Sequence, residues 1–228
     1  MLSNFFKRII TSIFLIVLLC FCLFYNEFTW KSLVIFFLLL CFYEFNNLIN
    51  KIFKNKFFNI ILLFLIGLYL YFFYYLLIKI RFEFGEEVIL ILLIACIFSD
   101  IGGYVIGKLI GGPKLISLSP NKTISGAIGS ILFSVSGTIL FLFFLKKIDK
   151  YPITLEFSFI IYLWLILMSI YCQIGDLIIS YLKRKANLKD TGNMLPGHGG
   201  ILDRVDGVIF AIPFGFFTYN IFIFNSSV

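Results

Sequence analysis

The sequence predicts an all-α fold, a polytopic integral membrane helical bundle, from its composition, its apolar runs and the placement of its basic residues. Of the 228 residues, 61% are hydrophobic and 14% are charged, and the mean hydropathy is +1.04. Soluble domains average about 45–50% apolar and about 25% charged residues. A soluble core of this size cannot hide 31 phenylalanines, so the composition excludes a soluble fold.

The apolar runs give the number of membrane helices. About 20 consecutive apolar residues span the bilayer as a helix, and we expect about seven (six to nine) transmembrane helices. The runs cover about 9–26, 32–50, 57–78, 88–110, 124–145, 153–175 and 204–224. The first run follows Lys7 and Arg8 and lacks a cleavage site, which favours a retained helix over a signal peptide. The sixth run continues in helical character to residue 185, so that helix either projects from the membrane or breaks near Gly175.

The distribution of basic residues predicts the orientation. With the N-terminus in the cytoplasm, the other side of the membrane receives six of the 19 basic residues, Lys31, Lys79, Arg81, Lys146, Lys147 and Lys150. The remaining 13 lie on the cytoplasmic side, as is typical of membrane proteins. The polar loops 108–123 and 183–203 then both face the cytoplasm. The net charge of +7 therefore reflects topology, and no nucleic-acid partner is expected.

Residues 99–114, "SDIGGYVIGKLIGGPK", place a carboxylate inside an apolar run. Asp100 lies eight residues before Lys108, and so about 12 Å deeper in the membrane than the cytoplasmic edge. A carboxylate at such a depth is costly and commonly faces a functional cavity, which makes Asp100 a candidate site residue. Close helix packing is the expectation for glycines that recur every four residues, here Gly103, Gly107 and Gly111.

Residues 118–126, "LSPNKTISG", form a polar loop before the next apolar run. Thr123 or Ser125 is expected to cap the helix that follows. The hydroxyl groups and the ammonium of Ser119, Lys122 and Thr123 suit a bound phosphate at a helix N-terminus. An ordinary capped turn explains the same residues equally well.

The longest polar cluster is "QIGDLIISYLKRKANLKDTGNMLPGHGGILDRVDG", residues 173–207. If this stretch is helical, one face of the helix carries a carboxylate, a hydroxyl and two cations. These groups belong to Asp176, Ser180, Lys183 and Arg184. A flexible glycine loop that includes His198 follows, and the last apolar helix then begins with Asp203, Arg204 and Asp206. Acidic residues in a first helical turn suit the helix dipole, but that effect explains neither Asp176 nor the glycines beside the histidine.

These residue types favour transfer of a phosphoryl or nucleotidyl group. A zinc site is not expected, because one histidine and no cysteine lie near the carboxylates. Oxygen ligands beside many cations favour Mg²⁺, held through one or two carboxylates, water and substrate phosphates. A serine–histidine–aspartate triad would lack the G-x-S-x-G nucleophile turn. Metal-assisted positioning of phosphates is therefore the predicted chemistry.

Residues 180–206 resemble the signature of the phosphatidate cytidylyltransferases, also called CDP-diacylglycerol synthases. The matching positions are Ser180, Lys183, Arg184, Lys189, Asp190, Pro196, Gly197, His198, Gly199, Gly200, Asp203, Arg204 and Asp206. Upstream, "SDIGGYVIGKLIGG", "SPNKTISG" and "CQIGDLIIS" are similar to other family motifs, with Gly103 where alanine is usual and Ser125 where the family has glutamate. The resemblance covers about 99–207. Before it, the similarity is confined to apolar character and Tyr43-Glu44-Phe45.

The resemblance implies that CTP and phosphatidate react to give CDP-diacylglycerol and pyrophosphate in phospholipid biosynthesis. It implies Asp176 and Asp203 as ligands of Mg²⁺, and it leaves open a second, monovalent cation such as K⁺ and a homodimer. The implied catalytic residues are Asp176, Asp203, His198, Lys183 and Arg184. The implied substrate-binding or phosphate-binding residues are Asp100, Lys108, Ser119, Lys122, Thr123, Ser180, Lys189, Asp190, Gly199, Gly200, Arg204 and Asp206.

We expect residues 1–87 to form a scaffold of N-terminal transmembrane helices and residues 88–228 to form a catalytic domain whose site faces the cytoplasm. The expected location is a bacterial inner (plasma) membrane. A CDP-alcohol phosphotransferase is disfavoured, because Asp206-Gly207 is followed only by apolar residues. An ion-coupled carrier that uses Asp100 and Asp176 is disfavoured because the chain lacks repeated halves. A catalytically inactive scaffold stays open because of Ser125.

Overall fold

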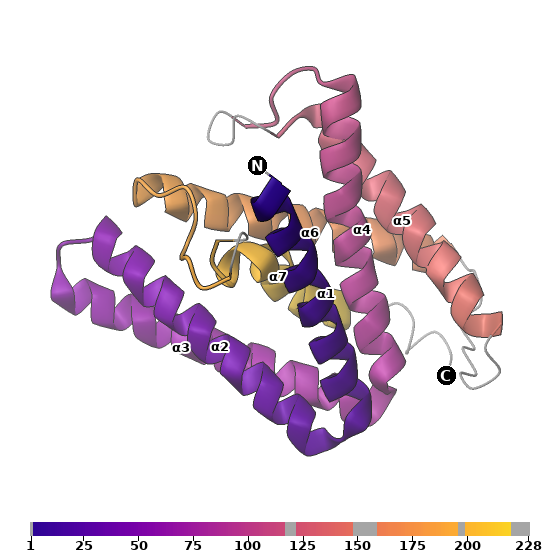
Figure 1. The fold of residues 1–228 in the computed structure, drawn as a ribbon, viewed down its shortest axis with the longest axis horizontal. Coiled ribbons are helices and arrows are strands. Elements are labelled where there is room, and N and C mark those ends of the chain that lie inside the picture. The colour runs from indigo at the N-terminus through magenta and orange to yellow at the C-terminus, as the bar shows by residue number, and fades with distance from the viewer. Residues whose placement is uncertain (1, 117–121, 148–158, 196–198, 220–228) are drawn as a thin grey trace. The chain divides into compact units, whose positions relative to one another are not determined.

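The computed structural model describes residues 2–116, 122–147, 159–195 and 199–219. Within these ranges the chain forms seven helices and no strand (Figure 1). They are α1 (Leu2–Tyr25), α2 (Glu27–Ile52), α3 (Lys56–Phe84), α4 (Glu86–Ile110), α5 (Ile124–Lys147), α6 (Phe159–Lys185) and α7 (Leu202–Tyr219). Each of the seven predicted apolar runs corresponds to one of these helices, which confirms the all-α prediction.

The lengths and compositions of the helices fit a membrane protein that crosses the bilayer several times. Of the helices in the described ranges, five (α2 to α6) are long and apolar enough to span a membrane. Within α1 the apolar part is shorter, Ile9–Tyr25. Large apolar side chains are exposed along these helices, among them Phe14, Phe36, Phe64 and Leu140. Lipid contact satisfies such surfaces, whereas water does not. The predicted orientation of the N-terminus stays a prediction.

Contacts within the chain group it into two compact units. The first comprises Met1–Lys79 and Leu182–Val205, and the second comprises Ile80–Tyr181 and Asp206–Val228. Helices α6 and α7 therefore each contribute residues to both units. The expected division at residue 87 into a scaffold and a catalytic domain stays a prediction.

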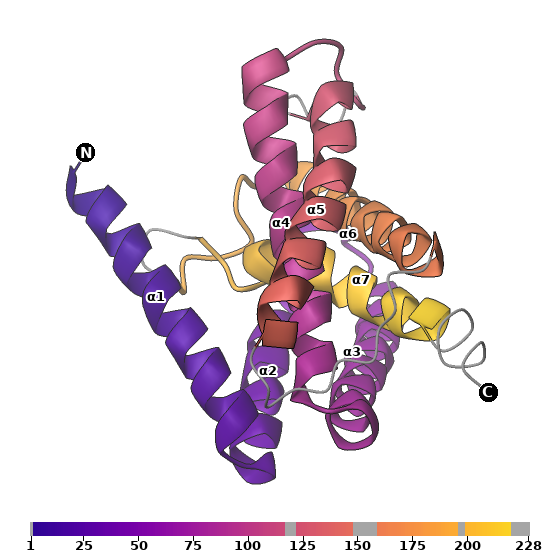
Figure 2. The ribbon, with the colours of Figure 1, turned by 90° about the vertical axis from the view of Figure 1, so that its right-hand side faces the viewer.

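Helices α4 and α5 of the second unit pack side by side through glycines (Figures 1 and 2). A Cβ atom at Gly102 would overlap the carbonyl oxygen of Gly129, and one at Gly107 would lie 3.3 Å from Gly126 Cα. The predicted packing role is thus confirmed for Gly107. Gly111 has a different role, because it ends α4 with a φ of 64° and a Cβ atom added there would have no neighbour within 4 Å.

Helix α6 runs without a break through Gly175 to Lys185. Its 27 residues correspond to about 40 Å, which exceeds the hydrocarbon thickness of about 30 Å. A Cβ atom at Gly175 would lie 2.6 Å from the backbone oxygen of Asp206. Of the two predicted alternatives, the break near Gly175 is therefore wrong, because the glycine instead lets α7 approach α6 closely.

Candidate functional site

The polar segment after α6 begins with a defined turn. Leu188 N donates to the carbonyl of Lys183 at 2.8 Å, and Asn187 N donates to that of Arg184 at 3.0 Å. Asn187 has a φ of 55°, a left-handed conformation that asparagine tolerates better than most residues. Because this pair of hydrogen bonds ends the helix, the chain turns away from the α6 axis immediately after its last basic residues.

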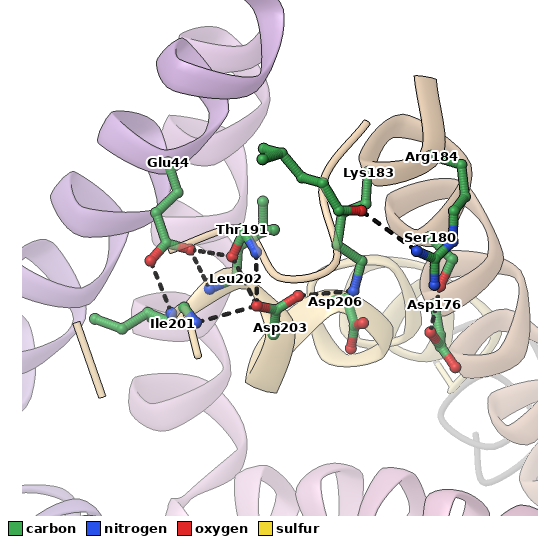
Figure 3. Close-up of polar contacts among 12 residues, drawn as sticks. Glu44, Asp176, Ser180, Lys183, Arg184, Thr191, Ile201, Leu202, Asp203 and Asp206 are labelled. Atoms are coloured by element: carbon green, nitrogen blue, oxygen red, sulfur yellow. Dashed lines mark hydrogen bonds and ion pairs between the residues drawn. The ribbon is translucent and has the colours of Figure 1, made fainter. Parts of the chain in front are cut away.

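Asp203, in the first turn of α7, organises this segment (Figure 3). Its Oδ1 atom accepts a hydrogen bond from Lys183 Nζ at 2.7 Å. Its Oδ2 atom accepts from Thr191 N at 2.8 Å, Thr191 Oγ1 at 3.0 Å and Gly200 N at 3.0 Å. Burial alone would raise the pKa of the Asp203 carboxyl, but Lys183 and the two backbone N–H groups outweigh it and hold the pKa below its usual range. Asp203 is therefore ionised at neutral pH.

A second carboxylate, Glu44 of α2, holds the same segment (Figure 3). The residue is only 1% exposed. Its Oε1 atom accepts from Ile201 N at 2.9 Å, and its Oε2 atom accepts from Leu202 N at 2.9 Å and from Thr191 Oγ1 at 2.6 Å. The two backbone groups belong to the start of α7, where N–H groups lack partners within the helix. Glu44 therefore caps α7 from another helix.

Sequence reasoning missed Glu44 as a site residue. Two signals were available: it is a carboxylate inside an apolar helix, and it belongs to the Tyr43-Glu44-Phe45 motif. It falls within the predicted scaffold, and its partners lie about 150 residues downstream, since Thr191 follows Glu44 by 147 residues.

The glycines of this segment provide room for the carboxylates. A Cβ atom at Gly192 would lie 2.7 Å from Glu44 Oε1, and one at Gly200 would overlap Thr191 Oγ1. Gly199 has a φ of 81°, and a Cβ there would lie 3.1 Å from Asp203 Oδ2. The sequence predicted a flexible glycine loop, but these three glycines are closely packed. His198, like residues 196 and 197, lies outside the described residues.

The second unit contains a further lysine–carboxylate pair. Asp176 Oδ2 lies 2.5 Å from Lys122 Nζ, and Asp176 Oδ1 accepts from Ser180 Oγ at 3.2 Å. The side chains of Asp176 and Lys122 are 32% and 24% exposed, but the Lys122 Nζ atom itself is buried. Three predicted site residues are thus brought together, two from α6 and one from the loop before α5. The residues predicted to share one face of α6 therefore have different partners. Asp176 pairs with Lys122, whereas Lys183 pairs with Asp203.

The loop before α5 ends in the predicted cap. Gly126 N donates to Thr123 Oγ1 at 3.0 Å, and Thr123 immediately precedes α5. The hydroxyl of Ser125 lies 2.9 Å from that of Thr123 and donates to the carbonyl of Gly111. The Ser125 hydroxyl therefore ties the start of α5 to the end of α4. Ser119, the remaining residue predicted in this loop, lies outside the described residues.

Three other predicted residues make contacts of a different kind. Asp100 of α4 is exposed and accepts a weak hydrogen bond from Cys172 Sγ at 3.7 Å. Lys108 is exposed, with its ammonium 5.6 Å from the centre of the Tyr104 ring. The Oδ1 atom of Asp206 accepts from the N–H of the next residue at 2.9 Å.

The basic residues at the end of α6 and the start of α7 are largely exposed. Arg184 is exposed and donates to the carbonyl of Leu188 at 3.4 Å. Lys189, Asp190 and Arg204 are also exposed. Exposed cations at a polar loop attract anions from solution.

The carboxylates of Asp176 and Asp203 are the kind of ligand that Mg²⁺ takes when a substrate completes its coordination shell. Among the residues that the structure describes, no three histidine, cysteine, aspartate or glutamate side chains gather to hold a metal. Asp176 and Asp203 each contact a lysine ammonium, so each carboxylate favours a positive charge beside it. Mg²⁺ commonly takes only one or two carboxylates and completes its shell with water and substrate phosphates. Each of the two pairs by itself offers one carboxylate of the kind that such an ion uses.

Residues 48–222 match the Cytidylyltransferase family. The match covers most of the chain, so the protein belongs to this family. The matched range includes both lysine–carboxylate pairs and begins four residues after Glu44.

Individual relatives carry a more specific name. The chain is 44% identical over 129 residues to the phosphatidate cytidylyltransferase of Helicobacter pylori (strain J99), a match covering 56% of this chain and 45% of that protein. It is 41% identical over 125 residues to that of Bacillus subtilis (strain 168), covering 54% and 44%. It is also 41% identical over 133 residues to that of Staphylococcus haemolyticus, covering 57% and 47%. The chain thus spans about half the length of the curated relatives it matches.

Proposed function

We propose that this protein is a phosphatidate cytidylyltransferase, an enzyme that converts CTP and phosphatidate to CDP-diacylglycerol and pyrophosphate. The observation that carries the proposal is the presence of two lysine–carboxylate pairs, Lys122–Asp176 and Lys183–Asp203, in a member of the Cytidylyltransferase family. The names of the curated relatives give the substrates.

The proposed reaction needs charge neutralisation and positioning more than acid–base catalysis. An oxygen of the phosphatidate monoester attacks the α-phosphorus of CTP, a new P–O bond forms, and the bond to the bridging oxygen breaks to release pyrophosphate. A phosphate monoester is already anionic at pH 7, so its oxygen needs no strong base. Bringing two anions together in line is the main barrier, and fixed cations lower it.

The chain's own residues supply these functions. The Lys122 and Lys183 ammonium groups bind phosphate oxygens, while Asp176 and Asp203 would hold Mg²⁺, which supplies further positive charge when bound. The more exposed cations Arg184, Lys189 and Arg204 take the outer phosphates, and His198 positions a phosphate. We also propose that a second, monovalent cation such as K⁺ binds beside the carboxylates. The proposed oligomeric state is a homodimer.

The proposed location is the bacterial inner membrane, with the site on the cytoplasmic face. The excess of basic residues on one side of the predicted topology supports the orientation. Both substrates suit this location, because CTP is cytoplasmic and phosphatidate resides in the membrane.

The proposal is tested with the full chain in lipid nanodiscs that contain phosphatidate. With Mg²⁺ and CTP labelled at the α-phosphorus, we expect label to move into a lipid-extractable product. A folded protein that leaves the label in the aqueous phase would overturn the proposal.

Matched variants then test the assigned residues. Asp176→Asn removes the charge beside Lys122 and is expected to lower kcat about 100-fold or more. Glu27→Gln removes an exposed carboxylate that pairs with Lys31 one turn along α2, and it should leave kcat within about twofold because surface pairs contribute little. Full activity of Asp176→Asn would remove that residue from the site while leaving the proposed reaction in place.

A further inference from the structure

Glu44 is a buried carboxylate in an apolar helix, and the hydrogen bonds described for it come from one short segment. Its donors are Thr191 Oγ1, Ile201 N and Leu202 N. Burying a carboxylate is costly unless its oxygens are well hydrogen-bonded. The two N–H groups at the start of α7 also provide the partial positive charge of a helix N-terminus. The carboxylate and this segment therefore fix each other in place.

The hydrogen bonds continue from Glu44 to Asp203. The Thr191 hydroxyl oxygen lies 2.6 Å from Glu44 Oε2 and 3.0 Å from Asp203 Oδ2. The backbone N–H of Thr191 also donates to Asp203, and the two residues that Glu44 caps immediately precede Asp203 in the chain. Glu44 thus fixes the backbone before Asp203 and the hydroxyl beside it, which leaves Oδ1 directed at Lys183 Nζ, 2.7 Å away.

Two glycines leave space for the Glu44 carboxylate. Cβ atoms at Gly192 and Gly200 would both lie 2.7 Å from Oε1, and the one at Gly200 would lie 2.5 Å from Oε2. These separations are shorter than van der Waals contact of about 3.5 Å. A side chain at either position would displace the carboxylate, so the backbone around Glu44 is shaped to admit it.

We propose that Glu44 is a positioning residue for the Lys183–Asp203 pair, acting through Thr191 and the first turn of α7. The inference rests on the proposed function, in which that pair binds phosphate and Mg²⁺. A carboxylate is required because Oε1 and Oε2 accept from different N–H groups. Glutamine would turn an NH₂ group toward one of these donors. The outer hydrogen-bonding partners of a metal-binding carboxylate commonly change activity or metal affinity 10–100-fold.

The test compares four variants of the full chain in nanodiscs. Glu44→Gln and Thr191→Val are expected to lower kcat about 10–100-fold and to raise the Mg²⁺ concentration needed for half-maximal rate, with the KM for phosphatidate within twofold. Thr191→Ser keeps the hydroxyl and should retain kcat within about threefold. Asn59→Leu removes another buried polar side chain of the same unit, one that bonds Asn50 and Phe53 instead, and it should retain kcat.

Amide hydrogen exchange supplies a readout that does not need turnover. In Glu44→Gln, amides of residues 199–203 should exchange at least tenfold faster than in the wild type, while those of α4 and α5 are unchanged. Wild-type exchange and kcat in this variant would overturn the inference, as would equal losses of kcat in Thr191→Ser and Thr191→Val or in Asn59→Leu. A wild-type protein without CTP turnover would instead overturn the proposed function, and the exchange data would still decide whether Glu44 holds the segment.

Discussion

Replacing Gly200 with alanine tests how closely the segment before α7 packs around its two carboxylates. The φ of Gly200 is not in the left-handed region, unlike that of Gly199, so alanine meets no backbone strain there. The added methyl group would overlap Thr191 Oγ1 and lie 2.5 and 2.7 Å from the two oxygens of Glu44. Any effect of the substitution therefore reports on packing alone.

The expected cost follows from the contacts that the methyl group would break. A carbon normally approaches another heavy atom no closer than about 3.5 Å, so the Glu44 carboxylate must withdraw by about 1 Å. Thr191 Oγ1 must also leave the two carboxylates between which its single proton is shared, and a hydrogen bond to a charged group contributes about 1.5–3 kcal/mol. Relaxation of the surrounding residues reduces the total cost of these two effects toward the roughly 1–3 kcal/mol that is usual for overpacking. We expect a loss of about 3 kcal/mol in the free energy of unfolding.

The assay is unfolding in mixed detergent micelles, together with kcat in the nucleotidyl-transfer reaction. A 1 Å displacement in a catalytic site can lower the rate about 100-fold, and we expect a fall of that order. Gly67→Ala is the matched control, because its Cβ would lie 3.6 Å from Phe42 Cε2, an ordinary contact in the middle of α3. It should be neutral or stabilising by up to about 1 kcal/mol. If Gly200→Ala matches this control in stability and rate, the packing argument is wrong.

Two further predictions concern the same segment. Asn187→Gly should leave the free energy of unfolding within about 0.5 kcal/mol of wild type. Asn187→Val should lose about 1–2 kcal/mol, because the φ of 55° at position 187 disfavours a branched side chain. Equal stability of the two variants would contradict the proposed helix end. Because folding lowers the pKa of Asp203, its ionised form stabilises the fold fully above the unfolded value of about 3.9 and progressively less as the pH falls through the folded value. The stability difference between wild type and Asp203→Asn should therefore stay constant from about pH 8 to pH 5 and narrow below about pH 4, and a difference that narrows already at pH 6 would count against the lowered pKa.

The parts of the site that sequence reasoning found are those that local geometry determines. Asp176 and Ser180 are four residues apart on a helix, and the structure joins them by a hydrogen bond. The position before an apolar run predicts Thr123 or Ser125 as a cap, and the structure shows that Thr123 caps α5. In both cases the partners are close in sequence, so helix periodicity and capping rules suffice to pair them.

The sequence by itself determined the membrane class, the seven helices and the polar residues from which a site is built, because hydropathy and helix periodicity depend only on neighbouring residues. The tertiary structure decided which of those residues pair. It placed Lys183 against Asp203 and Lys122 against Asp176, and it brought Glu44 to Thr191, Ile201 and Leu202. It also showed that Gly192 and Gly200 make room for that carboxylate. Such pairings depend on how helices pack, and a buried carboxylate is stabilised only by the donors that packing brings to it.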